Sequence, residues 1–100
     1  MRFEWDDEKE KINITKHGIA FRTAELVFGD ENRIEMYDEE HSTPEEERYI
    51  TIGSINEVML VVTVVYTPRG KDGDIIRLIS ARKATRTEKE AYYNDDNTYR

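Results

Sequence analysis

The sequence has 100 residues, 37% of them charged, a formal net charge of −7 and no cysteine. A chain of this length is expected to form one domain over residues 1–100, and without cysteine it has neither disulfides nor thiolate metal sites. The N-terminus lacks the apolar segment of a signal peptide, and the longest apolar run, residues 58–66, is about half a membrane span, so we expect a cytoplasmic protein with no membrane segment.

The first third of the chain predicts a short edge strand and two helices. Residues 2–5 alternate between charged and aromatic side chains, as in a strand at the edge of a sheet. Asp7 and Glu10 have the spacing of a capping box, which predicts a helix that begins near this box and ends at Gly18. A second helix is expected over residues 19–29, where apolar side chains recur at helical spacing.

Four strands are predicted in the middle of the chain. Residues 32–38 and 47–55 alternate between apolar and polar positions, although the second of these segments does so weakly. Residues 57–67 form a continuous apolar and β-branched run, which is typical of a central strand. Residues 75–83 form the last predicted strand.

The connections between these strands are predicted from turn-forming residues. Asn56 and Glu57 indicate a tight hairpin, and residues 68–74 form a turn rich in glycine and aspartate. Residues 38–47 are almost all acidic or turn-forming, and they predict a solvated loop.

A closing helix is predicted after the last strand. Thr85 and Glu88 have the spacing of a second capping box, and residues 94–100 are expected to be frayed. The order of elements indicates an α+β fold, with two N-terminal helices packed on an antiparallel sheet of about four strands, and a C-terminal helix.

Cationic side chains gather in the C-terminal half of this acidic chain. Residues 1–48 carry 15 acidic and 7 basic side chains, whereas residues 49–100 carry 7 acidic and 8 basic ones. Arginine suits phosphate because its planar guanidinium donates two parallel hydrogen bonds. Arg77 and Arg82 therefore indicate a local phosphate-binding surface or, alternatively, ion pairs with nearby carboxylates. Strict alternation along the strand would point these two side chains to opposite faces.

Residues suited to proton transfer or metal binding are few. Lys16 and His17 lie in the last turn of the first predicted helix, where a cation also favours the helix dipole, so a catalytic and a structural interpretation both stay open. His41 lies in the acidic loop, and two separated histidines without cysteine do not predict a zinc site. No metal or cofactor is expected. The motifs of serine hydrolases, P-loop NTPases and zinc proteases are missing from the sequence.

Three stretches are spread along most of the chain, between residues 3 and 85: FEWDDEKEKINITKHGIAF, EERYITIG and VYTPRGKDGDIIRLISARKAT. In them the chain resembles the BrnT toxins of bacterial type II toxin–antitoxin systems. The resemblance implies a RelE-like fold and metal-independent ribonuclease activity. It also implies a BrnA-type antitoxin with a ribbon–helix–helix DNA-binding region as partner. Toxin and antitoxin would together repress their own operon, so direct DNA binding by this chain is not expected.

Under this resemblance the cationic strand has a hypothetical role in RNA cleavage. The RNA 2′-hydroxyl would attack the adjacent phosphorus, and fixed cations would stabilise the negative charge of the transition state. The candidates for phosphate binding and charge stabilisation are Arg77, Arg82 and Lys83, with Arg48 and Arg69 as secondary candidates. The candidates for proton transfer, among which the sequence does not choose, are Lys16, His17 and Tyr66.

Two features depart from the pattern expected of this family. The closing helix is less basic than expected, and the loop before Arg48 is unusually acidic, so both repel RNA at long range. The acidic loop would then dock the antitoxin, in a complex that weakens as salt rises. The main alternative function is a non-catalytic toxin fold that only binds the antitoxin and acts in co-repression. A second alternative is a stand-alone regulatory binding module.

Overall fold

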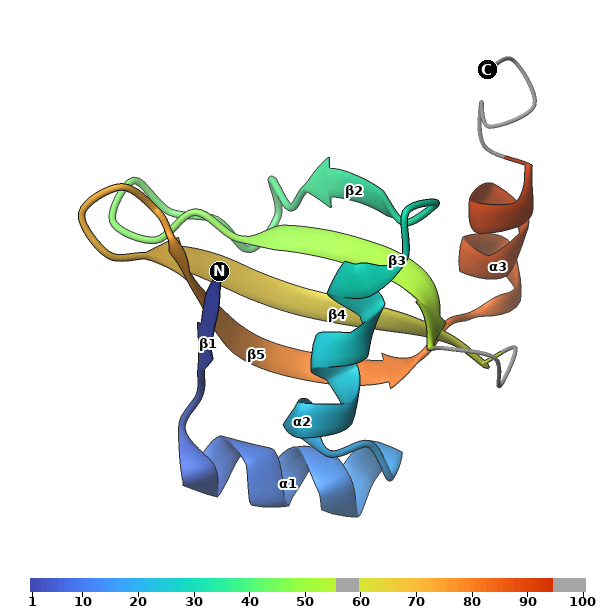
Figure 1. Cartoon of the computed structure of the whole chain (residues 1–100), viewed down its shortest axis with the longest axis horizontal. Coiled ribbons are helices and arrows are strands. Elements are labelled where there is room, and N and C mark those ends of the chain that lie inside the picture. The colour runs from blue at the N-terminus through green and yellow to red at the C-terminus, as the bar shows by residue number, and fades with distance from the viewer. Residues whose placement is uncertain (56–59, 95–100) are drawn as a thin grey trace.

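The computed structural model describes residues 1–55 and 60–94 of the chain. Its elements in chain order are β1 (Arg2–Glu4), α1 (Asp7–His17), α2 (Phe21–Ala24), the 3₁₀ helix η1 (Glu25–Gly29), β2 (Ile34–Tyr37), β3 (Tyr49–Ile55), β4 (Leu60–Arg69), β5 (Ile75–Lys83) and α3 (Arg86–Tyr93) (Figure 1). The predicted hairpin at Asn56 and Glu57 lies outside the described residues, as does most of the predicted frayed tail. No helix of the described part is both long and apolar enough to cross a membrane.

The sheet is mixed, with the strand order β1-β5-β4-β3-β2. Strands β2 to β5 form the predicted antiparallel meander, whereas β1 pairs in parallel with β5 and places Phe3 opposite Ile76. The α+β class is therefore confirmed. The sheet has five strands rather than about four, because the short N-terminal segment joins it as an edge strand. The RelE-like classification of the fold stays a prediction.

The ends of α1 are set by local hydrogen bonds. Asp6, rather than the predicted Asp7, caps the helix, because its carboxylate accepts the backbone N–H groups of Glu8 and Lys9 at 2.8 and 3.1 Å. Gly18 ends the helix with a φ of 71°, as predicted. Glu10 has a different role from the predicted one, since it accepts the N–H of the first α2 residue at 2.9 Å.

Two other helix predictions are resolved by the structure. Instead of one helix over residues 19–29, the structure has two short consecutive helices, α2 and η1, over residues 21–29. The capping box of α3 is confirmed, because the side chain of Thr85 accepts the N–H of Glu88 and the Glu88 carboxylate accepts the N–H of Thr85.

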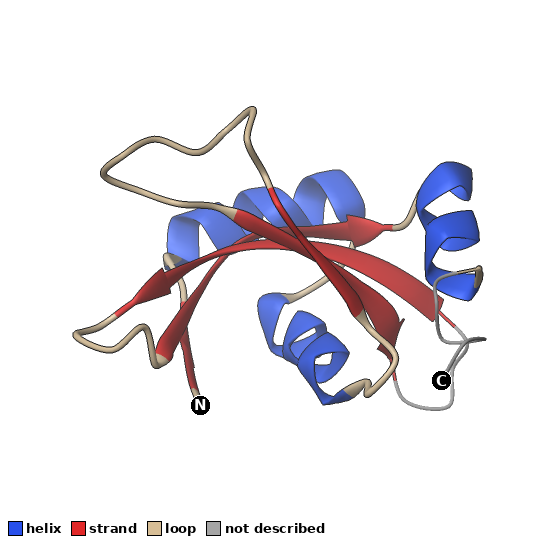
Figure 2. Ribbon diagram, turned by 90° about the horizontal axis from the view of Figure 1, so that it is seen from above, coloured by secondary structure: helices blue, strands red, loops and turns tan. Residues whose placement is uncertain are grey.

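The two faces of the sheet are covered differently. Helices α2 and η1 pack on one face, which we call the covered face, and the main apolar core there includes Phe21, Val27, Val64 and Leu78. Figure 2 shows these helices on one side of the sheet, and α3 with the loop of residues 38–48 on the other.

The second face, which we call the open face, carries Thr63, Val65 and Thr67 of β4. Helix α3 covers one of its ends through a small second core of Ile52, Val61, Ala84 and Tyr92. The 38–48 loop covers the other end, where the Thr67 hydroxyl donates to the backbone carbonyl of Glu47 at 2.7 Å. Between the two ends, Val65 and the neighbouring Ile50 are only partly buried. The sheet therefore presents a partly exposed surface between α3 and the loop.

Candidate functional site

A bulge in β5 places Arg77 and Arg82 on the same face of the sheet. Arg77 lies opposite Thr67 and Arg82 lies opposite Thr63, so residues 63–67 of β4 are matched by residues 77–82 of β5, which contain one residue more. The extra residue is Ile79, which has no partner in the register. This corrects the prediction from strict alternation, which separates the two arginines onto opposite faces.

The burial pattern of β5 agrees with this bulge. Leu78 and Ala81 are buried in the main core, while the two residues between them, Ile79 and Ser80, are both half-buried. In a regular strand one of these two would enter the core. Both instead belong to the open face, which therefore carries Arg77, Ile79, Ser80 and Arg82 from β5.

β1 pairs only with residues 75–77 of β5, and farther along the same edge a side chain of α1 takes the place of a strand. The buried Asn13 amide donates to the Ala81 carbonyl at 2.8 Å and accepts the Ala81 N–H at 3.0 Å, as a neighbouring strand would do. This contact fixes α1 beside the open face. A cavity of about 180 Å³ lies at the junction, and it is lined by Lys9, Ile12, Asn13, Lys16, His17, Ile79 and Ser80.

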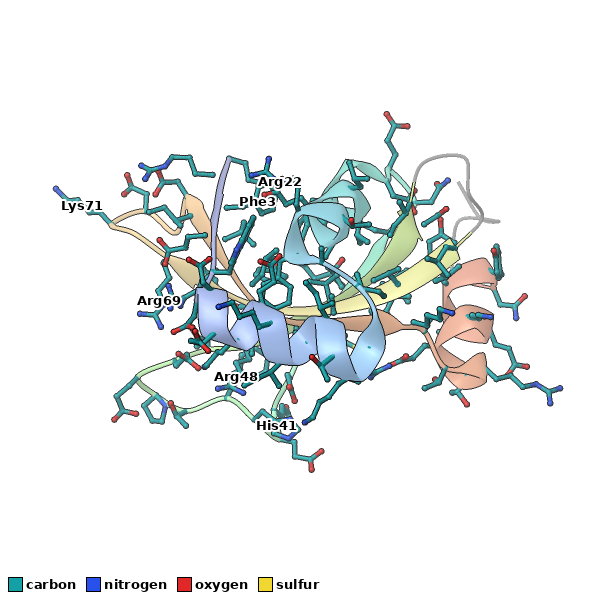
Figure 3. The ribbon with its side chains drawn as sticks, turned by 90° about the horizontal axis from the view of Figure 1, so that it is seen from below. Phe3, Arg22, His41, Arg48, Arg69 and Lys71 are labelled. Atoms are coloured by element: carbon teal, nitrogen blue, oxygen red, sulfur yellow. The ribbon has the colours of Figure 1, made fainter. Side chains whose placement is uncertain are left out.

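Two arginines share one carboxylate at the loop end of the open face. Nε of Arg48 lies 2.9 Å from Glu46, and Nη2 of Arg69 lies 3.0 Å from the other oxygen of the same carboxylate. The hydrogen bond from Arg48 is the main reason that the pKa of Glu46 lies below its ordinary value. Nearby, Arg77 donates to Glu4 of β1 at 2.8 Å. In Figure 3, Arg48 lies on the lower side of the view and Arg69 at its left, both away from Arg22 at the top.

A more extensive network lies at the α3 end. Arg82 donates two hydrogen bonds to Glu88, at 2.7 and 2.9 Å. The same carboxylate accepts the Thr63 hydroxyl at 2.9 Å as well as the N–H of Thr85 in the capping box. The hydrogen bonds from Arg82 are the main cause that lowers the pKa of Glu88 to about 2.

Each arginine of the open face is therefore paired with a carboxylate, and its side chain is also partly exposed to solvent. The exposed fractions of their side chains are 31% for Arg48, 48% for Arg69, 32% for Arg77 and 36% for Arg82. A guanidinium has five N–H donors, so one or two bonds to a carboxylate leave donors for a phosphate. The arrangement can hold an anion across the open face, although the carboxylates reduce its net positive charge.

The remaining sequence candidates lie elsewhere. Lys83 is exposed and lies opposite Val62, one residue past Arg82, so its side chain points to the other face. Tyr66 is buried on the covered face, where its hydroxyl donates to Glu35 at 2.6 Å and burial raises its pKa above the ordinary value. Lys16 and His17 are exposed at the end of α1, beside the open face.

Sequence reasoning missed the carboxylates that hold the arginines, Glu4, Glu46 and Glu88. Glu88 was visible as part of a capping box, but nothing local indicates its bonds to Arg82. The bulge did leave a signal. If Arg77 and Arg82 both avoid a core that takes Leu78 and Ala81, their odd spacing requires one extra residue in the strand.

Comparisons with known proteins agree with the fold. The family model described as "Ribonuclease toxin, BrnT, of type II toxin-antitoxin system" matches residues 5–88. The 1.1 Å crystal structure of the Brucella abortus ribonuclease toxin BrnT is similar, with a TM-score of 0.60 and 25% sequence identity over 86% of this chain and 99% of that chain. No match is found among curated proteins.

Proposed function

Because this chain belongs to the BrnT family of ribonuclease toxins of type II toxin–antitoxin systems, we propose that it cleaves RNA by attack of the 2′-hydroxyl on the adjacent phosphorus, without a metal ion. Membership of the family implies an RNA target and an antitoxin partner. The observation that carries the proposed mechanism is the β5 bulge, which gathers Arg77 and Arg82 on the open face together with Arg48 and Arg69.

The arginines stabilise the reaction through charge. Negative charge builds on the phosphoryl oxygens as the 2′-oxygen bonds to phosphorus and the 5′-oxygen leaves. Preorganised N–H donors aimed at that charge each contribute about 10²–10³ in rate in comparable enzymes. The carboxylates on Arg48, Arg69 and Arg77 hold these side chains in place before RNA binds. The products are a 2′,3′-cyclic phosphate and a free 5′-hydroxyl.

The candidate residues differ in the role that we propose for each in phosphate binding. Arg77 and Arg82 are the principal phosphate-binding residues, and Arg48 and Arg69 extend the site toward the 38–48 loop. Lys83 is left out of this set, because its side chain leaves from the other face.

The ribonuclease proposal is tested with purified chain and a mixed RNA substrate, in buffer with excess chelator. We expect chelator-resistant cleavage and fragments that end in a 2′,3′-cyclic phosphate. Arg77→Ala should lower the cleavage rate strongly. Arg22→Ala is the matched control, because Arg22 is an exposed arginine on α2, on the other side of the molecule. Cleavage that stops with chelator, or that is equal in the two variants, would contradict the mechanism.

We further propose that the partner is a BrnA-type antitoxin with a ribbon–helix–helix DNA-binding region, and that the complex represses its own operon. The 38–48 loop exposes Glu39, Glu40, Glu45 and Glu47, so a basic antitoxin segment would be attracted to it. Association between the two chains should weaken steeply between low and high salt, as measured by calorimetry. Association that does not respond to salt would exclude this loop as the main docking surface.

One observation favours the alternative of a toxin fold without catalysis. Each arginine of the open face already has a carboxylate partner, which lowers the attraction of this face for RNA. In that case the purified chain would bind the antitoxin and cleave no RNA under any condition. The chelator experiment therefore separates the two functions.

A further inference from the structure

His41 and Asp38 form a hydrogen-bonded pair in the 38–48 loop that the mechanism above does not use. Nδ1 of His41 lies 3.0 Å from Oδ2 and 3.2 Å from Oδ1 of Asp38. The side chain of Asp38 is 9% exposed, whereas that of His41 is 59% exposed. The buried carboxylate thus holds Nδ1, while Nε2 has no hydrogen-bond partner among the described residues.

The backbone of Arg48 fixes this pair in place. The N–H of Asp38 donates to the Arg48 carbonyl at 2.9 Å. The Ser42 hydroxyl accepts the Arg48 N–H at 2.8 Å and donates to the same carbonyl at 3.2 Å. Asp38 also accepts the backbone N–H of His41 at 3.3 Å. Residues 38–42 therefore form an ordered turn that rests on Arg48.

The turn lies beside the arginines of the loop end. Arg48 supports it with its backbone, and the side chain of Arg48 shares Glu46 with Arg69. Figure 3 shows His41 and Arg48 on the same lower side of the molecule. A phosphodiester held by Arg48 would lie on the same side of the molecule as the imidazole.

We propose that His41 is the general base of RNA cleavage and that Asp38 is its positioning residue; this rests on the proposed ribonuclease function. Nε2 of His41 takes the proton of the 2′-hydroxyl while the 2′-oxygen forms its bond to phosphorus. The bond between phosphorus and the 5′-oxygen breaks, and its electron pair stays on that oxygen, which takes a proton from water. The imidazolium then returns its proton to the hydroxide so formed.

The chemistry of the pair suits this role. Histidine is the side chain that changes charge near neutral pH. A carboxylate on Nδ1 keeps the proton there, so that Nε2 carries the lone pair that a base needs. Asp38 binds the ring directly, and the other charged groups of the loop are Glu39, Glu40, Glu46 and Arg48. From other elements, Arg69 and Lys9 act on Glu46. A purely structural role explains why Asp38 caps the turn, but it does not require the ring to be bound through Nδ1.

The test compares variants in cleavage and in binding. His41→Asn keeps an N–H donor for Asp38 and removes the base, so we expect cleavage to fall by about 10²–10⁴. Its affinity for a 2′-O-methyl RNA, which has no free 2′-hydroxyl and cannot react, should stay within about twofold of the wild-type affinity. Asp38→Asn should also lower cleavage, by at least about tenfold, because the amide favours the wrong tautomer of the ring. Asp38→Glu should recover part of the rate.

The controls separate this role from charge and from folding. Glu31→Gln removes one exposed carboxylate from the turn before β2 and should cleave like the wild-type chain. Circular dichroism shows whether each variant is folded. In the wild-type chain the rate should fall at acidic pH as the base is protonated, and this acidic limb should disappear in His41→Asn.

Two results would overturn the proposal. In the first, the wild-type chain cleaves RNA and His41→Asn cleaves it equally fast. This result would refute His41 as the base, but it would leave the ribonuclease function standing. The second is a loss of cleavage and of the acidic limb in His17→Gln, with His41→Asn unaffected. A wild-type chain that cleaves no RNA would overturn the ribonuclease function and this proposal together.

Discussion

The two ends of the open face hold their arginines in different ways. At the α3 end, Arg82 binds Glu88 with two hydrogen bonds, and the same carboxylate also accepts Thr63 and the α3 cap. At the loop end, Arg48 and Arg69 each give one bond to a shared carboxylate. At the α3 end the Glu88 carboxylate accepts four hydrogen bonds, whereas at the loop end each guanidinium donates only one bond to Glu46.

This difference teaches that one residue type serves two purposes on the same face. A carboxylate with four hydrogen bonds anchors α3 to the sheet, so Arg82 is important for stability as well as for phosphate binding. Arg77 has one bond to Glu4 and belongs to the loop end, because it lies opposite Thr67. The comparison predicts that substitutions at the loop end change activity more than stability, whereas substitution of Arg82 at the α3 end lowers both.

The largest effect is expected for Arg77→Ala. Cleavage should fall by about 10²–10³, because a donor to the transition-state charge is lost. The free energy of unfolding should fall by less than about 1 kcal/mol, since the side chains of Arg77 and Glu4 are 32% and 40% exposed. Parallel cleavage assays and urea titrations measure both quantities. If stability falls enough to explain the loss of activity, the distinction between the ends is wrong.

Acid should destabilise the chain through the α3 end. The pKa of Glu88 is about 2 in the folded chain and near 4.5 when unfolded, so its contribution is present above pH 4.5 and is lost as pH falls toward 2. The shift corresponds to at most about 3 kcal/mol, and we expect nearer 2 because Arg82 is a third exposed. Urea unfolding at several pH values should show this slope in the wild-type chain and a weaker one in Glu88→Gln. Glu90→Gln, an exposed change on the same helix, should keep the wild-type slope.

Arg82→Ala should lower the free energy of unfolding by about 2 kcal/mol. The substitution leaves Glu88, which is 21% exposed, without its charged partner. Arg86→Ala is the control, because Arg86 is exposed in the first turn of the same helix, and its effect should stay within about 0.5 kcal/mol. Equal urea midpoints for the two variants would mean that α3 does not depend on Arg82.

The smallest effect is expected on the covered face. Tyr66→Phe removes the hydrogen bond to Glu35, which should cost about 1 kcal/mol. Cleavage should change by less than about twofold, because the phenol lies on the other side of the sheet from Arg77 and Arg82. A large loss of cleavage in a folded Tyr66→Phe would return Tyr66 to the catalytic candidates.

Much of the fold follows from local sequence signals. The four predicted strands, the left-handed Gly18 and the Thr85 capping box are all present. The errors are also local in origin: the first cap is displaced by one residue because Asp6 and Asp7 are equally good caps by type. The candidate site was predicted less well, since alternation along a strand does not reveal a bulge.

The sequence by itself determined the order and type of most helices and strands, and that cations gather late in an acidic chain, because these properties depend on neighbouring residues. Only the tertiary structure decided that β1 pairs with β5, that Asn13 completes the edge of β5, and that a bulge turns Arg77 and Arg82 to one face. Each of these features is a hydrogen bond or a register between segments far apart in the chain. Such partners are chosen by packing, since a buried backbone or charged group must find its partner wherever the fold brings one within reach.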